Sequence, residues 1–316
     1  MHLMEMIDVE SLTRDYGHGR GVFDVTFRVH PGEVFGFLGP NGAGKTTTIR
    51  HIMGFSRPQA GRIRVMGRDA WKDAAAIKRR VGYLPGELAF PEGMTGAAFI
   101  RFMAGLRGLA GYGRAPELLE RFELNPSGDI KRMSLGERRK LAVVCAFMHD
   151  PELLVLDEPT SALDPLMQER FVQFVLDEKV AGKSILLSSH IFAEVDATCD
   201  RIAIIKDGRI VSTVVADDLR HPDERVFKVE FAEAGAAERF ATATGLTLDM
   251  RRFEQNQLRL RVGSGRLNEL FRELAGYRLR YLTEIPFTLE DYFMSFYDRA
   301  ATVEAGREAM AHGIDR

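Results

Sequence analysis

The chain has 316 residues, of which 45% are hydrophobic and 28% charged, and its formal net charge is −2. This length is enough for one large domain and a smaller one, and the composition is that of an ordinary globular protein. The near-neutral charge gives no reason to expect nucleic acid as a partner. The N-terminus lacks the basic-then-apolar layout of a signal peptide, and no apolar run approaches the length of a membrane span. We therefore expect that any work at a membrane needs another chain that crosses it.

The first elements in chain order are two segments of alternating polarity, 7–13 and 22–29, which predict strands of an antiparallel edge sheet. The turn-rich loop between them carries Tyr16. An aromatic side chain at such a loop tip can fill a core or be exposed by chance. Its position ahead of a phosphate-binding loop favours a third interpretation, which is stacking on an adenine ring.

That phosphate-binding loop follows a short apolar strand at 33–38 and has the spacing Gly, four residues, Gly-Lys-Thr. Its glycines allow successive backbone N–H groups to point inward, and a helix beginning near Lys45 adds its positive end. Lys45 can then reach the β- and γ-phosphates, and the Thr46 hydroxyl can ligate magnesium. The alternative is a glycine-rich surface turn with an incidental lysine. The residues predicted to bind nucleotide here are Gly39, Pro40, Asn41, Gly42, Ala43, Gly44, Lys45, Thr46 and Thr47.

The next segments alternate strands and helices. They predict strands at 62–66 and 81–84, and helices at 71–80, 95–109 and 116–122. Most apolar side chains of the helix at 95–109 are expected to lie in the core. Ser134 is a candidate N-cap for a segment that leads into a helix at 141–148, with Glu137 as its capping-box partner. That structural role alone would explain both residues.

A second chemical signal is the apolar strand at 153–156, which is followed by Asp157 and Glu158. Acids at the carboxyl end of a buried parallel strand point into the crevice where α/β sheets bind ligands. Two adjacent carboxylates beside phosphates are costly unless a cation lies near them. Asp157 is therefore predicted to hold magnesium, and Glu158 to orient the attacking water or take its proton. The alternative is a solvated strand end.

Asp164 and Pro165 have the residue types of an N-cap and first position for a helix that extends to residue 180. A strand at 184–189 then ends at His190. A lone histidine after a strand is more often structural than catalytic. Because this strand end shares the crevice edge with Asp157, a functional role for His190 becomes the better interpretation.

These segments, in this order, resemble the ATP-binding subunit of an ABC transporter over residues 5–220. Six motifs carry the resemblance: the adenine-stacking aromatic Tyr16, the phosphate loop 39–46, the signature segment 134–137, the Walker B strand with its catalytic acid at 153–158, the D-loop 161–164 and the switch histidine His190.

The resemblance implies an α/β fold, a P-loop NTPase sheet with an antiparallel edge sheet and a helical subdomain at about 86–150. It also implies that two such domains pair head to tail around two Mg-ATP molecules. Ser134 and Gly136 would then bind the γ-phosphate of the opposite subunit's ATP, and Asp164 of the D-loop would be a further nucleotide-binding residue. Glu158 would catalyse hydrolysis and His190 would sense the γ-phosphate.

The Tyr-Leu-Pro stretch at 83–85 and the additional C-terminal segment make drug or antibiotic exporters of the ABC-2 type the most similar group. The implied partners are a second copy or a paralogous ATP-binding subunit, and a separate membrane permease. The chain would then lie at the cytoplasmic face of the membrane, with the loop 85–94 and the helix 95–109 receiving the permease. Two alternatives are a non-transport ATP-dependent switch and an ATP-binding interaction module with little turnover.

The chain departs from the family pattern at two places. Leu135 and Glu137 replace the usual Gly and Gln of the signature segment, while Ser134 and Gly136 are kept. Gly86 stands where the family usually has a glutamine that touches magnesium and senses the membrane partner. A water or Glu87 could fill the missing ligand position.

From residue 221 the pattern strand, helix, strand, strand, helix, strand predicts a small ferredoxin-like α+β domain that extends to about residue 300. It contains no catalytic or metal-ligating constellation, and we expect it to regulate the enzyme or to help a dimer form. An aromatic-rich helix is predicted at 289–297, and 301–316 is expected to be a flexible tail.

Overall fold

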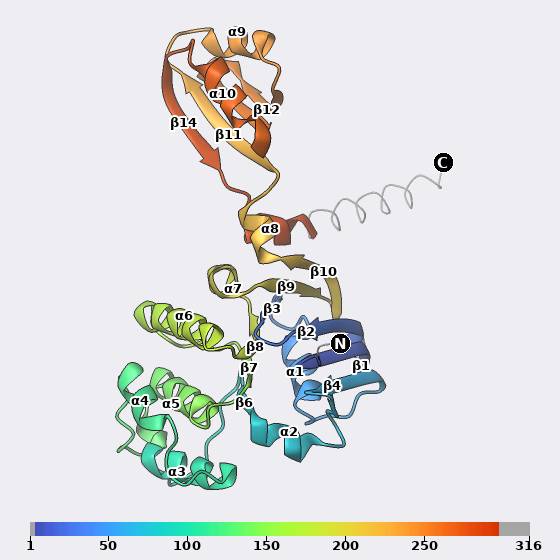
Figure 1. Cartoon of the computed structure of the whole chain (residues 1–316), viewed down its shortest axis with the longest axis vertical. Coiled ribbons are helices and arrows are strands. Elements are labelled where there is room, and N and C mark those ends of the chain that lie inside the picture. The colour runs from blue at the N-terminus through green and yellow to red at the C-terminus, as the bar shows by residue number, and fades with distance from the viewer. Residues whose placement is uncertain (1–3, 297–316) are drawn as a thin grey trace. The chain divides into compact units, whose positions relative to one another are not determined.

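The computed structural model describes residues 4–296, and the chain divides into two compact units at Ala216 and Asp217 (Figure 1). The first unit contains a six-stranded sheet with the strand order β10-β9-β3-β8-β7-β6. Five of the strands are parallel, and β10 runs antiparallel to β9. The strands are β3 Val34–Leu38, β6 Val81–Leu84, β7 Leu153–Asp157, β8 Ser184–Ser189, β9 Arg201–Lys206 and β10 Arg209–Val215.

Every residue of β3, β7 and β8 is buried, as expected for central parallel strands that are covered on both faces. On one face, α1 (Lys45–Ile52) lies between this sheet and a second, antiparallel sheet (Figure 1). Phe27 of β2 stacks on Phe35 of β3, with 5.1 Å between ring centroids. The second sheet has the order β2-β1-β4-β5, which confirms the predicted edge sheet. Its strands are β1 Ile7–Asp15, β2 Gly21–Val29, β4 Ala60–Val65 and β5 Arg68–Asp69.

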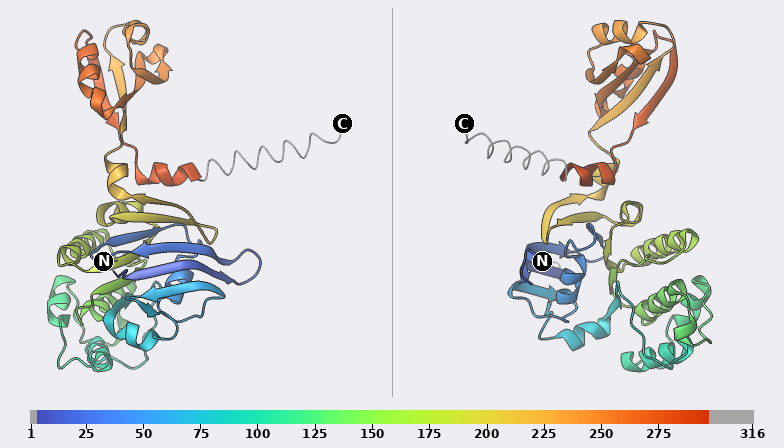
Figure 2. Two further views of the ribbon diagram at one scale, coloured as in Figure 1. Left: turned by 45° about the vertical axis from the view of Figure 1, so that its right-hand side comes forward. Right: turned by 180° about the vertical axis from the view of Figure 1, so that it is seen from behind.

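Helices α3 to α6 lie on the other side of the six-stranded sheet (Figure 2). Phe147 of α5 and Phe174 of α6 pack together, with 4.7 Å between ring centroids, and Phe122 packs against Phe174. The helices of this unit are α2 Ala74–Arg80, α3 Gly96–Arg107, α4 Ala115–Arg121, α5 Leu135–Phe147, α6 Pro165–Val180 and α7 Phe192–Thr198, with the 3₁₀ turn Ile130–Arg132. Among residues 4–296, no helix combines the length and hydrophobicity that a membrane crossing requires.

Two predicted helix starts need correction. Helix α2 begins at Ala74 rather than at residue 71, because the Asp69 carboxylate accepts hydrogen bonds from the backbone N–H groups of Trp71 and Lys72 and forms a turn there. Helix α5 begins at Leu135, six residues before the predicted 141–148, because the capping box of Ser134 and Glu137 forms completely.

The expectation that most apolar residues of α3 lie in the core is wrong. Ile100 is buried, but 48% of Phe102 and 62% of Leu106 are exposed. Phe99 and Met103 are partly buried and line a groove described below. The apolar spacing predicted the helix correctly but could not show which of its faces the rest of the chain covers.

The second unit has the antiparallel strand order β12-β13-β11-β14. Together with the βαββαβ chain order, this confirms the ferredoxin-like prediction. The elements are β11 Glu224–Phe231, α9 Ala236–Ala243, β12 Thr247–Arg252, β13 Gln257–Gly263, α10 Leu267–Leu274 and β14 Leu279–Ile285, preceded by α8 Ala216–Arg220 and with 3₁₀ turns at Phe253–Gln255 and Ser264–Arg266. The predicted aromatic-rich helix is present over 289–296. Its last predicted residue and the expected tail lie outside the described residues.

Candidate functional site

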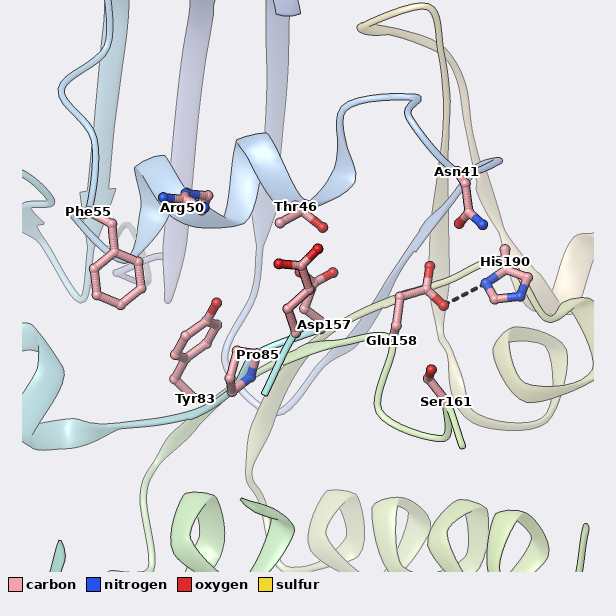
Figure 3. Close-up of a pocket in the computed structure, with 12 residues that line it drawn as sticks. Asn41, Thr46, Arg50, Phe55, Tyr83, Pro85, Asp157, Glu158, Ser161 and His190 are labelled. Carbon is pink, nitrogen blue, oxygen red and sulfur yellow. Dashed lines mark hydrogen bonds and ion pairs between the residues drawn. The ribbon is translucent and has the colours of Figure 1, made fainter. Parts of the chain in front are cut away.

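A cavity of about 590 Å³ lies where loops leave the carboxyl ends of the parallel strands (Figure 3). Its walls include Asn41, Thr46, Asp157, Glu158 and His190, which the sequence predicts as site residues. The other lining residues are Arg50, Phe55, Tyr83, Pro85, Gly86, Glu87 and Ser161. The fold therefore brings the phosphate-binding loop, both adjacent acids and the histidine to one place.

The phosphate-binding loop requires its glycines. A Cβ atom at position 39 would lie 2.5 Å from the Ile205 carbonyl oxygen, and one at position 44 would lie 2.8 Å from a methyl of Val22. Gly42 and Gly44 also have φ angles of +82° and +113°, which L side chains rarely adopt. Within residues 4–296, no side chain caps the N-terminus of α1, so its first backbone N–H groups are available to an anion.

Lys45 is only 5% exposed, and its ammonium is held inside the loop. Its Nζ atom donates to the carbonyl oxygens of Gly39, at 2.6 Å, and Pro40, at 3.1 Å. It also lies 3.0 Å from Glu158 Oε1. The ion pair was not predicted from the sequence. A phosphate entering the loop would compete with Glu158 for this ammonium.

Asp157 is fully buried, and its two carboxylate oxygens differ. Oδ1 accepts a 2.5 Å hydrogen bond from the Ser188 hydroxyl, whereas Oδ2 has no hydrogen-bond partner among the described residues. The carboxylate faces the Thr46 hydroxyl across the cavity (Figure 3). A buried carboxylate oxygen without a donor is costly, and an oxygen pair of this kind suits a hard divalent cation. The residues present therefore fit magnesium.

Sequence reasoning missed Ser188. The residue lies beside Asp157 in the parallel register of β7 and β8. A serine at the end of the strand 184–189 was the available signal, but its value depends on knowing that these two strands are neighbours.

Glu158 connects the lysine to the histidine. Its Oε2 atom lies 2.6 Å from Nδ1 of His190 (Figure 3). The backbone of Glu158 has a φ of +50°, which is rare for a residue with a side chain. Its N–H donates to the Ser188 carbonyl oxygen at 3.0 Å, which helps to hold this conformation. Local strain of this kind is concentrated at functional sites.

Of the predicted loop 39–47, Asn41 and Thr46 line the cavity, and four predicted residues elsewhere in the chain do not: Tyr16, Ser134, Gly136 and Asp164. Tyr16 is 54% exposed, and the guanidinium carbon of Arg14 lies 5.2 Å from its ring centroid. The Ser134 hydroxyl accepts from the backbone N–H of Glu137, which caps α5. Asp164 accepts from the backbone N–H of Met167, which caps α6. The structural roles of both caps are present in the single chain.

A second cavity, of about 290 Å³, shares Phe55, Tyr83 and Pro85 with the first. Its remaining lining is mostly apolar and includes Phe90, Phe99 and Met103. Burial, aided by the charge of Asp157, raises the pKa of Tyr83 to about 12, so this phenol stays protonated at neutral pH. One wall thus separates the polar cavity from an apolar groove.

Comparisons with known proteins show the family to which the chain belongs. Residues 22–161 match the family model of ABC transporters. The daunorubicin resistance ATP-binding protein DrrA3 of Streptomyces coeruleorubidus is 35% identical over 77% of this chain and 80% of its own length. The bacitracin transport ATP-binding protein BcrA of Bacillus licheniformis is 31% identical over 92% of this chain and 96% of its own length.

Two solved structures have similar folds. The structure of an ATP-binding subunit of an ABC transporter has a TM-score of 0.63 and 34% identity, and the match covers 68% of this chain and 92% of that one. A dimeric ATP-binding cassette in a post-hydrolysis state with ADP and Pi has a TM-score of 0.60 and 20% identity, with 67% and 99% covered.

Proposed function

Because this chain belongs to the ABC transporter family and is one of its ATPase subunits, we propose that it closes in pairs around two Mg-ATP molecules and drives a separate membrane permease. We propose further that the permease exports a drug or an antibiotic. The observation that carries the proposal is the cavity that joins the loop of Lys45 to Asp157, Glu158 and His190. The comparisons offer no support for the alternative of a non-transport ATP-dependent switch.

The chain's own residues divide the work as follows. The backbone N–H groups of the loop 39–47 and the Lys45 ammonium bind the phosphates. Thr46 and Asp157 hold magnesium, which when bound neutralises phosphate charge. Glu158 orients the attacking water and accepts its proton. His190 positions the Glu158 carboxylate through their 2.6 Å contact and senses the γ-phosphate.

The proposal of a pair rests on the residues that stay outside the cavity of the single chain. Ser134 is the N-cap of α5 and Gly136 lies in its first turn, at the positive end of the helix, which suits a phosphate. In a head-to-tail pair, this segment would meet the ATP held by the partner's loop 39–47. Tyr16 would stack on the adenine, and Asp164 would lie at the shared interface. A second copy or a paralogous subunit fits equally well.

The apolar groove beside the cavity supports docking of a permease. Phe90, Phe99 and Met103 line it, and it adjoins the catalytic cavity through Tyr83 and Pro85. An apolar segment of a cytoplasmic permease loop would fill it, which would place the chain at the cytoplasmic face of the membrane. The names of the two relatives, one for daunorubicin resistance and one for bacitracin transport, support export as the direction.

The test is ATP turnover by the purified chain beside its Glu158→Gln variant. We expect magnesium-dependent phosphate release to fall at least about 100-fold in the variant, because the group that activates water is lost. ATP binding should persist. Glu169→Gln, which changes an exposed glutamate of α6, is the matched control. Equal turnover in wild type and Glu158→Gln would contradict the proposed role of Glu158.

A further inference from the structure

Arg139 of α5 is a buried arginine. In the part of the chain that the structure describes, its side-chain hydrogen bonds all go to backbone carbonyls of two loops at the cavity. Only 3% of the residue is exposed. Nη1 donates to the Pro85 carbonyl oxygen and Nη2 to that of Gly86, each at 2.7 Å, and Nε donates to that of Ser161 at 3.2 Å. Burying a charged side chain is costly unless its donors are satisfied. Here the three bonds join one helix to two separate loops.

Both loops border the catalytic acids. A Cβ atom at Gly86 would lie 3.2 Å from Asp157 Oδ2, so the backbone of this loop lies directly against the carboxylate. The backbone N–H of Ser161 donates to the Glu158 carbonyl oxygen at 3.1 Å. Burial lowers the pKa of Arg139, while the charges of Asp157 and Glu158 act in the opposite direction. The guanidinium therefore lies within electrostatic reach of both acids.

The start of the same helix also contacts the second loop. A Cβ atom at Gly136 would lie 3.2 Å from the Ala162 carbonyl oxygen. Ala162 has a φ of +67° and Glu158 a φ of +50°, so the loop between them is strained at two non-glycine residues. Strained backbone persists only where its surroundings hold it. Arg139, in the helix that begins with the segment 134–137, helps to hold this loop through its hydrogen bond to the Ser161 carbonyl oxygen.

We propose that Arg139 is a positioning residue that links the segment 134–137 to the loops beside Asp157 and Glu158. The proposal rests on the proposed function, in which a second copy's ATP binds the segment 134–137. Through Arg139, the position of α5 would then determine the positions of the Gly86 and Ser161 backbones. Because Gly86 has no side chain to reach the metal, the bond from Arg139 to its carbonyl oxygen would position this loop through its backbone.

The first test compares Arg139→Gln and Arg139→Lys by amide hydrogen exchange, with Arg132→Gln as the control. Arg132 is an exposed arginine just before the segment 134–137. In Arg139→Gln we expect exchange at residues 86–88 and 161–163 to rise about tenfold or more, because up to three hydrogen bonds are lost. Exchange at residues 45–49 should stay unchanged. Arg139→Lys should be intermediate, because an ammonium cannot reproduce the planar fork.

The second test places the same changes in a Glu158→Gln background. We expect ATP affinity to stay within about threefold, since Arg139 makes no hydrogen bond to the phosphate-binding loop. The protein concentration needed for ATP-dependent dimers should rise at least about tenfold. If Arg139 only stabilised the core, its loss would not weaken dimer formation while leaving ATP affinity nearly unchanged.

Unchanged exchange in both loops, or unchanged dimer formation by Arg139→Gln, would overturn the inference. If the Glu158→Gln parent forms no dimer with ATP, the proposed function fails, and amide exchange still decides the role of Arg139. If Arg139→Gln loses its native circular dichroism, Arg139→Lys decides in its place, since it keeps the charge and the aliphatic stem.

Discussion

The two units of the chain differ in what they bury. Both have a sheet covered by helices and an apolar core. Among the described residues, however, every buried polar or charged side chain lies between positions 33 and 198, in the first unit. They include Lys45, Arg139, Asp157 and Glu194. The charged side chains of the second unit, such as Arg261 with Asp249, remain at its surface.

This difference distinguishes a unit that contains a candidate site from a unit with an ordinary apolar core. A buried polar group costs free energy unless it is paired, so its presence in a core indicates a function or a network that requires it. In the first unit, Lys45 and Asp157 belong to the candidate site, whereas Glu178 is paired with Arg114 and does not line the cavity. The described residues of the second unit follow the ordinary rule of apolar side chains inside and charged side chains outside. The following predictions test this division, from the largest expected effect to the smallest.

Truncation of the aromatic core of the second unit should destabilise that unit and leave nucleotide binding intact. Phe240 is 1% exposed and packs on Phe231 and Tyr277, with ring centroids 5.4 and 5.3 Å apart. Phe240→Ala should cost about 4 kcal/mol of unfolding free energy, and Phe240→Leu about 1 kcal/mol. Denaturant unfolding and ATP titration of the two variants measure both quantities. An ATP affinity that falls in step with stability would break the division between the units.

Removing the buried ammonium of Lys45 should instead weaken nucleotide binding and leave the stability of the second unit unchanged. Lys45→Ala should weaken ATP binding about 100-fold, because hydrogen bonds to charged phosphate oxygens are lost. Lys72→Ala, at an exposed lysine, should leave the affinity unchanged and serves as the control. Isothermal titration with ATP and magnesium gives both values. Equal affinities for the two variants would show that the loop binds phosphate without its lysine.

Glu194 makes the stability of the first unit depend on pH. Burial raises its pKa to about 7 from an ordinary value of 4.5, and hydrogen bonds from Ser189 and Thr160 only partly offset this. A raised folded-state pKa means that the folded chain binds the proton more tightly. The stabilisation is therefore complete below pH 4.5 and is lost as the pH rises to about 7.

Between pH 5 and pH 8 the wild type should consequently lose about 2.5 kcal/mol more stability than Glu194→Gln, in which the side chain is always neutral. Urea unfolding at the two pH values tests this, with Glu169→Gln as the control. Parallel pH dependence of the wild type and Glu194→Gln would remove Glu194 as the cause.

The smallest effect concerns one arginine from each unit. Arg114 Nη2 lies 2.7 Å from Oε1 of Glu178, which is only 3% exposed. Arg114→Ala should cost about 2 kcal/mol, because it leaves a buried carboxylate unpaired. Arg261 pairs with Asp249 and Glu224 at the surface, and Arg261→Ala should cost less than about 1 kcal/mol. Thermal unfolding of both variants makes the comparison, and a larger loss for Arg261→Ala would reverse it.

Local patterns were sufficient for much of the fold and for part of the site. The phosphate-binding loop, the caps at Ser134 and Asp164 and the two acids at the end of β7 each depend on residues close in sequence, so spacing alone predicted them. The ferredoxin-like unit was predicted because its strands and helices alternate clearly.

Other features depend on which distant segments become neighbours, and these could not be predicted. The Lys45–Glu158 ion pair, Ser188 beside Asp157, and the bonds of Arg139 to two loops all join positions far apart in the chain. The exposure of Phe102 and Leu106 is a related case, because helical periodicity does not reveal what covers each face.

The central claim is that the catalytic site is completed by a second chain. Light scattering of Glu158→Gln with and without Mg-ATP tests it most directly, because the mass of the chain, 35.4 kDa, should double only when ATP is present. Adding Lys45→Ala or Ser134→Arg to that variant should keep it monomeric, whereas Arg132→Gln should not. A mass that is the same with and without ATP, or a dimer that tolerates Ser134→Arg, would contradict the account.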